Sequence, residues 1–247
     1  MLVLTRQLRL VYQFNMDLFY LPELNQTTGE LVFSKEESKH INKVLRKKQG
    51  DKVRTTNGKG LEATIELTIV GTNQVHGNIV EAKMHQPLPY KLHIAIAPTK
   101  NNSRLEWFLE KATEIGIHQI TPLLCAHSER KTIKRERLEK IIAAALKQSQ
   151  QFYLPKLNSL TTFDSFVQEN ANGMIAHCRE GIKPSLFSVA SGNVNHTILI
   201  GPEGDFSEAE IALALAHNYQ PIGLGNQRLR TETAALVACH TIALKAH

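Results

Sequence analysis

The sequence predicts an α/β protein with two domains, in which a small β-barrel precedes a larger domain built on a mostly parallel sheet. Residues 31–84 contain short segments rich in Val, Ile and Thr that are divided by turn residues, which is typical of a small barrel. From residue 91 onward, apolar strand-like segments alternate with amphipathic helical segments, which is typical of a parallel sheet covered by helices. A chain of 247 residues accommodates one large domain or two modest ones.

The overall composition is that of an ordinary globular protein with a basic charge balance. Hydrophobic residues make up 42% and charged residues 21% of the chain, which excludes an intrinsically disordered protein. No apolar run approaches the roughly 20 residues that a membrane-spanning helix requires. The formal net charge of +6 and the pI of about 9.2 favour a polyanionic partner.

The three cysteines, Cys125, Cys178 and Cys239, show neither a CxxC motif nor paired spacing. Such a sparse and odd set is typical of reduced thiols, so the sequence predicts a cytoplasmic protein without a disulfide framework. His177 precedes Cys178 and His240 follows Cys239, and adjacent pairs of this kind do not match the usual spacing of zinc ligands. We therefore expect no metal site.

The N-terminal region divides into four predicted strands, at residues 31–33, 51–56, 62–70 and 75–84. Asn57-Gly58, Lys59-Gly60 and Gly71-Thr72-Asn73 are the predicted turns between them. One short helix is expected at residues 38–46, with Ile41, Val44 and Leu45 on its buried face. Residues 85–90 contain two prolines and are the predicted linker. Arginines interrupt the apolar stretch of residues 1–15, so this segment is a poor match to a secretory signal peptide. We expect it to be a dispensable extension.

Basic residues are concentrated in the predicted barrel. Residues 35–59 contain nine Lys and Arg against three acidic residues, and this excess of six equals the net charge of the whole chain. Clustered cations bind phosphates, so this region is a candidate RNA-binding surface, although a solvated face is the usual explanation of any single lysine. The aromatic content of 6% argues against extensive base stacking. The candidate RNA-binding residues are Lys43, Arg46, Lys47, Lys48 and Arg54.

The C-terminal region opens with a predicted strand at residues 91–97, followed by a helix with a capping box at Ser103 and Glu106 and a stop at Gly116. A strand at 118–124 and a helix at 135–150 follow, after a second basic run at residues 130–137. Further strands are predicted at 173–178, 196–200 and 221–225. The buried helix positions are expected at Leu105, Phe108, Leu109, Ala112, Ile115, Leu138, Ile141, Ile142, Ala145 and Leu146.

Twice in residues 198–238 an apolar strand enters a glycine-containing loop and then a helix. The first loop carries Gly201 and Gly204, and a capping box at Ser207 and Glu210 starts its helix. The second follows a strand that ends at Gly223-Leu224-Gly225. Ligands of open α/β sheets bind beyond the carboxyl ends of the strands, so a small-molecule site between the two loops is expected. Tight strand-to-helix turns are the alternative explanation of these glycines.

Several common sites are excluded by the motifs that are missing. The chain has no GxxxxGK[ST] sequence, which argues against a P-loop nucleotide triphosphatase. It has no GxGxxG sequence after a strand, so neither a dinucleotide site nor the usual Rossmann methyltransferase loop is supported. A GxSxG nucleophile elbow is also missing. The glycine loops therefore indicate a different kind of pocket.

Three sequence segments resemble the RsmE family, in that family's order. They are IGPEGDFS at residues 200–207, LGNQRLRTETAAL at 224–236, and EKATEIGI at 110–117 with its downstream helix ending in KQSQ at 147–150. The resemblance runs from about Met16 to the C-terminus. It implies a PUA-like RNA-binding barrel at residues 16–86 and a SPOUT methyltransferase domain with a trefoil knot at 87–247, usually as a homodimer. The implied activity is methyl transfer from S-adenosylmethionine to N3 of a specific uridine of 16S rRNA in the small ribosomal subunit.

The resemblance also implies a cofactor site and a pair of catalytic residues. Arg230 would stabilise the negative charge of the deprotonated uracil, and Glu232 would accept its proton. An ion-paired helix start is the alternative role of both residues, and for Glu232 it is the favoured one. The cofactor-binding residues would be Ala176, His177, Ile200, Gly201, Glu203, Gly204, Leu224, Gly225, Leu229, Arg230, Thr231 and Thr233.

One position departs from the family pattern. Many relatives have a third glycine where this chain has Asp205, and Asp tolerates the left-handed backbone better than most residues, so the loop is expected to survive. Two other functions stay open. One is a SPOUT methyltransferase that acts on a different RNA, and the other is a non-catalytic ribosome-assembly factor that binds RNA.

Overall fold

The computed structural model describes residues 17–26, 29–191 and 194–246, and the expected extension at residues 1–15 lies outside them. The chain divides into two compact units. Of the described residues, the N-terminal unit comprises those up to Pro87 together with Leu146–Tyr153, and the C-terminal unit comprises Leu88–Ala145 with those from Leu154 onward. Among the described residues, no helix is both long and apolar enough to span a membrane.

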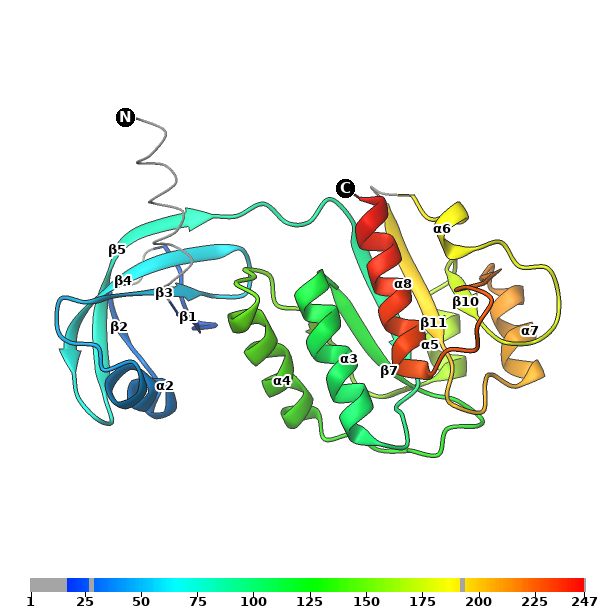
Figure 1. Cartoon of the computed structure of the whole chain (residues 1–247), viewed down its shortest axis with the longest axis horizontal. Helices are drawn as coiled ribbons and strands as arrows, with labels where there is room; N and C mark the ends of the chain where they lie inside the picture. Colours follow the sequence, from blue (N-terminus) through cyan, green and yellow to red (C-terminus); the bar gives the residue numbers. More distant parts are fainter. Residues whose placement is uncertain (1–16, 27–28, 192–193, 247) are drawn as a thin grey trace. The chain divides into compact units, whose positions relative to one another are not determined.

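The N-terminal unit is built on a five-stranded mixed sheet in the order β1-β3-β4-β5-β2 (Figure 1). β1 pairs in parallel with β3, and the remaining neighbours are antiparallel. Glycines with positive φ at positions 58 and 60 form the predicted turn between β3 and β4. The elements are β1 (Leu18–Tyr20), β2 (Glu30–Val32), α2 (Lys35–Lys39), η1 (His40–Val44), β3 (Lys52–Thr56), β4 (Leu61–Val70) and β5 (Val75–Met84).

The helical segment of this unit differs from the prediction at one position. α2 continues into η1, a π-helical turn in which the Leu45 amide donates to the His40 carbonyl at 3.0 Å. The wider turn changes which side chains face the sheet. Ile41 is fully buried as expected, whereas Val44 is 68% exposed. The predicted burial of Val44 is therefore wrong, because it assumed α-helical spacing throughout.

Residues 146–153 fold against the sheet of the N-terminal unit through polar contacts. Lys147 Nζ donates to Glu37 Oε1 at 2.9 Å, and Tyr153 donates its hydroxyl to the His85 carbonyl at 2.8 Å. The Phe152 ring stacks on the His85 ring with centroids 3.7 Å apart. This segment follows the C-terminal unit's residues in sequence, so sequence order alone does not reveal that it packs with the N-terminal sheet.

The C-terminal unit contains a seven-stranded sheet in the order β12-β10-β11-β6-β7-β8, with β9 also paired to β7. Every strand pair in it is parallel, which confirms the predicted α/β class. The elements are β6 (Lys91–Ile96), α3 (Asn102–Ile115), β7 (Gln119–Leu124), α4 (Arg135–Gln148), β8 (Lys156–Leu157), β9 (Thr161–Thr162), α5 (Phe163–Glu169), β10 (Met174–Ala176), α6 (Leu186–Val189), β11 (Asn195–Ile200), α7 (Glu208–Ala216), β12 (Gln220–Ile222) and α8 (Thr231–Lys245).

Helices cover both faces of this sheet, and strand alternation supplies a core to each. Ile94 and Ile96 of β6 pack with α3, α4 and α8, which lie on one face (Figure 1). Ala95 of the same strand packs with Phe163 and Phe166 of α5 and with α7 on the other face. The sequence analysis did not predict α5, α6 or the two-residue strands β8 and β9, because none of them has a long periodic pattern.

The two predicted capping boxes have different outcomes. The Ser207 hydroxyl accepts from the Glu210 amide while the Glu210 carboxylate accepts from the Ser207 amide, as predicted for the start of α7. α3 instead begins after Asn101, whose side chain accepts from the Ser103 amide at 3.0 Å. The Glu106 side chain does not cap the helix, because its Oε1 atom pairs with Arg137 Nε at 2.6 Å. The predicted capping box at Ser103 is therefore wrong.

Candidate functional site

Three loops meet at the carboxyl ends of three neighbouring parallel strands. Ala176 at the end of β10 lies in register with Ile200 of β11 on one side and Ile222 of β12 on the other. The chain leaves these strands through the β10–α6 loop (residues 177–185), the first glycine loop (201–206) and the second glycine loop (223–230). This is the edge of a parallel sheet at which ligands bind.

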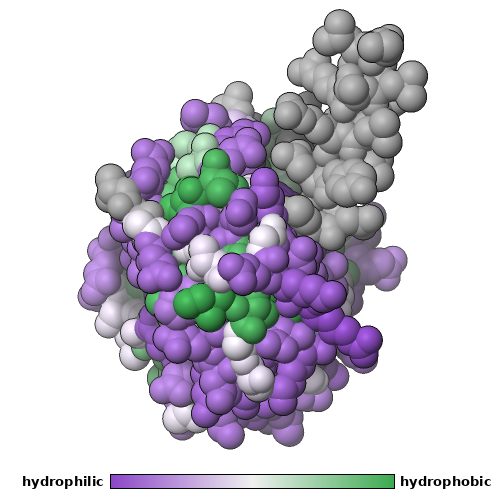
Figure 2. Space-filling view, turned by 90° about the vertical axis from the view of Figure 1, so that its left-hand side faces the viewer, coloured by the Kyte–Doolittle hydropathy of each residue, from purple (hydrophilic) through white to green (hydrophobic). Residues whose placement is uncertain are grey.

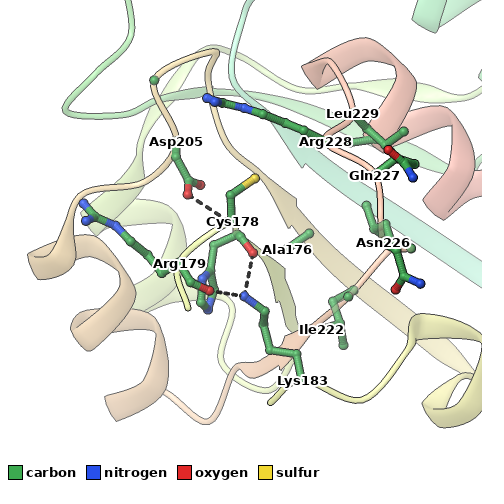
Figure 3. Close-up of a pocket in the computed structure, with 16 residues that line it drawn as sticks. Ala176, Cys178, Arg179, Lys183, Asp205, Ile222, Asn226, Gln227, Arg228 and Leu229 are labelled. Atoms are coloured by element: carbon green, nitrogen blue, oxygen red, sulfur yellow. Dashed lines mark hydrogen bonds between the residues drawn. The ribbon is translucent and has the colours of Figure 1, made fainter. Parts of the chain in front are cut away.

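The three loops line two adjoining pockets, of which Figure 3 shows the one lined by 16 residues. The major pocket, of about 710 Å³, is lined chiefly by the β10–α6 loop and the second glycine loop. The minor pocket, of about 270 Å³, is lined by the first glycine loop and the start of α8. Residues common to both linings show that the pockets adjoin, namely Ala176, Cys178, Asp205, Arg228, Leu229 and Ala234.

The first glycine loop is held together by the residue that departs from the family pattern. Asp205 has a φ of 64°, which confirms the expectation that it takes up a left-handed backbone. Its amide donates to the Pro202 carbonyl at 2.9 Å. One carboxylate oxygen accepts from the Phe206 amide and the other from the Cys178 amide, each at 2.9 Å. Asp205 therefore bridges the first glycine loop to the β10–α6 loop.

The glycines of this loop are required by close packing and not by their backbone conformation. Neither Gly201 nor Gly204 has a positive φ. A Cβ on Gly201 would lie 3.1 Å from the Phe206 ring, and one on Gly204 would lie 3.1 Å from the His127 Cβ. Such distances are shorter than ordinary van der Waals contact, so both sites favour glycine.

Two further hydrogen bonds fix the first glycine loop from outside. Glu203 Oε1 accepts from the Lys100 amide at 3.0 Å, which ties the loop to the segment between β6 and α3. The Thr231 hydroxyl donates to the Gly201 carbonyl at 3.1 Å and ties the loop to α8. These polar side chains are therefore used within the protein.

The β10–α6 loop forms a second wall of the major pocket. Lys183 Nζ donates to the His177 carbonyl at 2.9 Å and also to the Arg179 carbonyl, as the dashed lines of Figure 3 show. Burial lowers the pKa of His177, and the nearby Lys183 ammonium lowers it further, so the imidazole is neutral at pH 7. The His177 Nδ1 atom is buried and makes no hydrogen bond to the described residues.

The second glycine loop is anchored by main-chain bonds at one end and is open elsewhere. The Gly223 amide donates to the Pro184 carbonyl and its carbonyl accepts from the Leu186 amide, each at 2.9 Å. Gly225 has a φ of 130°, which favours glycine. A Cβ on Gly223 would meet nothing closer than 3.9 Å, and one on Gly225 would meet nothing within 4 Å. These two glycines therefore leave open space beside the major pocket.

The structure brings together most of the predicted cofactor-binding residues. The major-pocket lining includes Ala176, His177, Gly204, Leu224, Gly225 and Leu229. The minor-pocket lining includes Ala176, Ile200, Gly201, Glu203, Leu229, Arg230 and Thr231. Thr233 lines neither pocket.

The two predicted catalytic residues lie in different surroundings. Arg230 is the N-cap residue of α8, is exposed, and lines the minor pocket. Glu232 is only 6% exposed and lines neither pocket. Its Oε1 atom lies 3.7 Å from Arg104 Nε, and its Oε2 atom has no hydrogen bond to the described residues. The structure thus separates Glu232 from the cavity that Arg230 faces.

Four of the five predicted RNA-binding residues lie at the surface of the N-terminal unit. Lys43, Arg46 and Lys48 are exposed and Lys47 is partly exposed. Figure 2 shows a mostly hydrophilic face in this view, with small hydrophobic areas. Arg54 is different, because it is 8% exposed and its Nε atom lies 2.6 Å from Glu62 Oε1. The structure therefore does not place Arg54 with the other four.

Some pocket-lining residues were not singled out by the sequence analysis. These residues include Cys178, Lys183 and Arg228. One signal could have found Arg228, namely its spacing of two residues from Arg230, because alternate residues of an extended segment face the same side. In the described part of the chain, no cluster of His, Cys, Asp and Glu side chains could hold a metal ion.

Comparisons with known proteins match both units. The model of an RNA methyltransferase domain matches residues 86–243, and that of an RNA methyltransferase PUA domain matches residues 33–80. The ribosomal RNA small subunit methyltransferase E of Bacillus subtilis is 31% identical over 223 residues, which cover 84% of this chain and 87% of that protein.

Two solved structures are similar over nearly the whole chain. The probable rRNA-methyltransferase of Porphyromonas gingivalis is 35% identical with a TM-score of 0.86, covering 93% of this chain and 99% of that one. A putative methyltransferase of Legionella pneumophila, in complex with the bound cofactor SAM, is 30% identical with a TM-score of 0.83. The similarity covers 92% of this chain and 97% of the Legionella chain. This chain therefore belongs to the RsmE family of RNA methyltransferases that carry a PUA domain.

Proposed function

We propose that this protein transfers a methyl group from S-adenosylmethionine to N3 of a specific uridine in 16S rRNA. The observation that carries the proposal is the pair of adjoining pockets at the carboxyl ends of β10, β11 and β12, where eleven of the twelve expected cofactor-binding residues converge. The bound cofactor of the Legionella relative and the rRNA named for the Bacillus relative support the two substrates.

The major pocket fits S-adenosylmethionine in size and in chemistry. Pockets for ligands of this size measure about 300–1,000 Å³, and this one measures about 710 Å³. Ile222, Leu224 and Leu229 supply apolar surface for an adenine ring, and the open space beside Gly223 and Gly225 allows a ligand to approach the main chain. When bound, the cofactor supplies an electrophilic methyl carbon.

Arg230 is the proposed catalytic residue. The N3 atom of uridine is a good nucleophile only after its proton has left, and the resulting charge spreads over N3, O2 and O4. A guanidinium stays protonated and can donate to such an anion from the lining of the minor pocket. Glu232 faces Arg104 and not the pocket, so we propose that it fixes the start of α8 beside α3.

Methyl transfer by matched variants tests the role of Arg230. The substrate is the small ribosomal subunit from cells that lack this gene, and the product is measured by mass spectrometry of its 16S rRNA. Arg230→Ala should lower kcat by about 10²–10³-fold, as removal of a charge-stabilising donor does elsewhere. The dissociation constant of S-adenosylmethionine should change less than twofold. Equal losses of kcat and cofactor affinity would show that Arg230 only builds the pocket.

The cellular assignment is tested by deleting the gene. The 16S rRNA of the deletion strain should lack one N3-methyluridine, and a plasmid copy of the gene should restore it. Loss of a different methylated nucleotide would support a methyltransferase with another RNA target. Unchanged methylation together with cofactor binding in calorimetry would contradict the uridine assignment.

We further propose that the N-terminal domain, residues 16–86, binds the rRNA of the cytoplasmic small subunit and that residues 87–247 form the methyltransferase domain. The exposed Lys43, Arg46, Lys47 and Lys48 support this division. Arg46→Glu combined with Lys47→Glu should weaken RNA binding while leaving the affinity for S-adenosylmethionine unchanged. Unaltered RNA affinity would remove this surface from the interface.

A homodimer is the proposed assembly, and the trefoil knot implied by the resemblance stays a prediction. α3 and α8 lie side by side on one face of the C-terminal sheet (Figure 1), and they expose Trp107 by 42% and Leu244 by 56%. Large exposed apolar side chains on neighbouring helices support a protein interface. Trp107→Glu with Leu244→Glu should convert a dimer into a monomer in light scattering. A wild-type monomer would contradict the proposal.

A further inference from the structure

The charged side chains around the two pockets fall into two groups. The acidic ones are used within the protein, since Glu203 accepts from the Lys100 amide and Asp205 accepts from the Cys178 and Phe206 amides. The Lys183 ammonium is used as well, because it donates to two main-chain carbonyls. These groups therefore already have partners within the protein and help to shape the loops.

Two arginines form the second group. Within the described ranges, neither Arg228 nor Arg230 makes a side-chain hydrogen bond or ion pair, and both are exposed. Arg179, on the opposite wall, lies 3.5 Å from Glu208. The unpaired cations at the pockets are therefore concentrated on one short segment, directly before α8.

The two arginines lie close together in the segment that leads into α8. Arg230 is extended, with φ −70° and ψ 155°, and Arg228 precedes it by two residues, with the partly buried Leu229 between them. Both arginines line the minor pocket, and Arg228 lines the major pocket as well. In Figure 3 the Arg228 side chain extends from the second glycine loop toward the loop that carries Asp205.

We propose that Arg228 binds a phosphate of the substrate RNA next to the nucleotide whose base enters the pocket. This inference rests on the proposed function. A guanidinium presents a planar fork of donors that matches two phosphate oxygens, and an exposed, unpaired arginine gives up no existing partner when it binds. Phosphate contacts position a nucleic acid, so Arg228 would set the register of the target nucleotide while Arg230 acts on its base.

The carboxylate of S-adenosylmethionine is the competing anion, because it too can accept two hydrogen bonds from a guanidinium. The two sources predict opposite results. Phosphate binding makes RNA affinity depend on Arg228 and adds to its salt dependence, whereas carboxylate binding makes cofactor affinity depend on Arg228. The RNA arm needs no methyl transfer, so it can fail or succeed independently of the proposed function.

The experiment compares Arg228→Gln and Arg228→Lys with the charge-matched control Lys91→Gln. Lys91 is exposed at the amino end of β6, the opposite end of the sheet from the pockets. Binding to small ribosomal subunits from cells that lack the gene is measured over a series of KCl concentrations, and cofactor binding is measured by calorimetry. Thermal melting verifies that each variant is folded.

Arg228→Gln should lower the slope of log affinity against log salt by about 0.7–0.9, the value for one phosphate contact. It should raise the KM for the subunit about tenfold, leave the affinity for S-adenosylmethionine within twofold of wild type, and be partly rescued by Arg228→Lys. A salt slope equal to that of Lys91→Gln would overturn the proposal. So would a loss of cofactor affinity with unchanged RNA binding, which would assign Arg228 to the cofactor carboxylate.

Discussion

The two glycine loops have the same strand–loop–helix pattern, but the structure uses their side chains in opposite ways. In the first loop, Glu203 and Asp205 are hydrogen-bonded to main-chain amides of neighbouring segments. In the second, Asn226, Gln227 and Arg228 are exposed and line the major pocket. A shared sequence pattern therefore does not imply a shared role.

The glycines follow the same division. Gly201 is enclosed by Phe206, so its missing side chain serves the packing of the protein. Gly223 faces open space, so its missing side chain leaves room for a ligand. We infer that the first loop is a rigid part of the pocket lining and that the second loop contacts the substrates.

The largest expected effect comes from adding one methyl group to each loop. Gly201→Ala places a Cβ 3.1 Å from the Phe206 ring, and overpacking of this kind typically costs about 1–3 kcal/mol. At roughly 2–4 °C per kcal/mol, the melting temperature should fall by several degrees. Gly223→Ala should change the free energy of unfolding by less than about 0.5 kcal/mol, because its Cβ meets nothing closer than 3.9 Å.

Cofactor binding should reverse the order of these two variants. The Cβ of Gly223→Ala would occupy space beside the major pocket, so it should weaken S-adenosylmethionine binding in calorimetry more than it weakens the fold. Equal melting temperatures for the two variants would mean that the first loop is not rigid, and the contrast between the loops would be lost.

A smaller effect is expected from removing the bridge between the first glycine loop and the β10–α6 loop. Asp205→Gly suits the left-handed backbone better, yet it deletes the acceptor of the Cys178 amide. A hydrogen bond to an ionised carboxylate contributes about 1.5 kcal/mol at the low end of its range, which suits an exposed bond, so the affinity for S-adenosylmethionine should fall roughly tenfold. Hydrogen exchange of residues 177–183 should become faster.

Asp205→Asn is the matched control for this variant. Its amide oxygen can still accept one hydrogen bond, and Asn tolerates a positive φ, so its cofactor affinity should lie between those of wild type and Asp205→Gly. Wild-type affinity and unchanged exchange in Asp205→Gly would show that the bridge does not position the pocket.

The position of the site could be predicted from sequence because it follows from local patterns. Two apolar strands running into glycine loops define a sheet edge, and parallel pairing then brings Ala176, Ile200 and Ile222 together. The left-handed conformation at Asp205 was predictable for the same reason, since it depends on the preferences of one residue. Strand–loop patterns and the backbone preferences of single residues can be recognised in the sequence without knowledge of tertiary contacts.

The contacts that local patterns did not reveal depend on partners distant in sequence. An ion-paired helix start was the favoured role of Glu232, but its partner, Arg104, lies on another helix and no local pattern indicated it. Arg54 was expected at the surface, but Glu62 and residues of the 146–153 segment enclose it. Val44 was misplaced because the π-helical turn shifts the helical spacing, and no residue in the segment signals that turn.

The smallest expected effect is a pH dependence of cofactor binding that arises from His177, in the β10–α6 loop between the two glycine loops. Burial and the Lys183 ammonium hold the pKa of His177 below its usual 6.5, although Asp205 opposes this shift. A lowered pKa means that the neutral imidazole stabilises the folded state above pH 6.5, and that this contribution is lost as the pH falls through the folded-state pKa. Protonated His177 would also repel the sulfonium of the cofactor.

S-adenosylmethionine should therefore bind about two- to threefold more weakly at pH 5.5 than at pH 8, a modest charge effect in a partly solvated pocket. S-adenosylhomocysteine, which lacks the sulfonium charge, should show a smaller change. His177→Gln should remove the pH dependence, because glutamine does not titrate. If that variant kept the wild-type pH profile, His177 would not be the titrating group, and the link between its lowered pKa and cofactor binding would be lost.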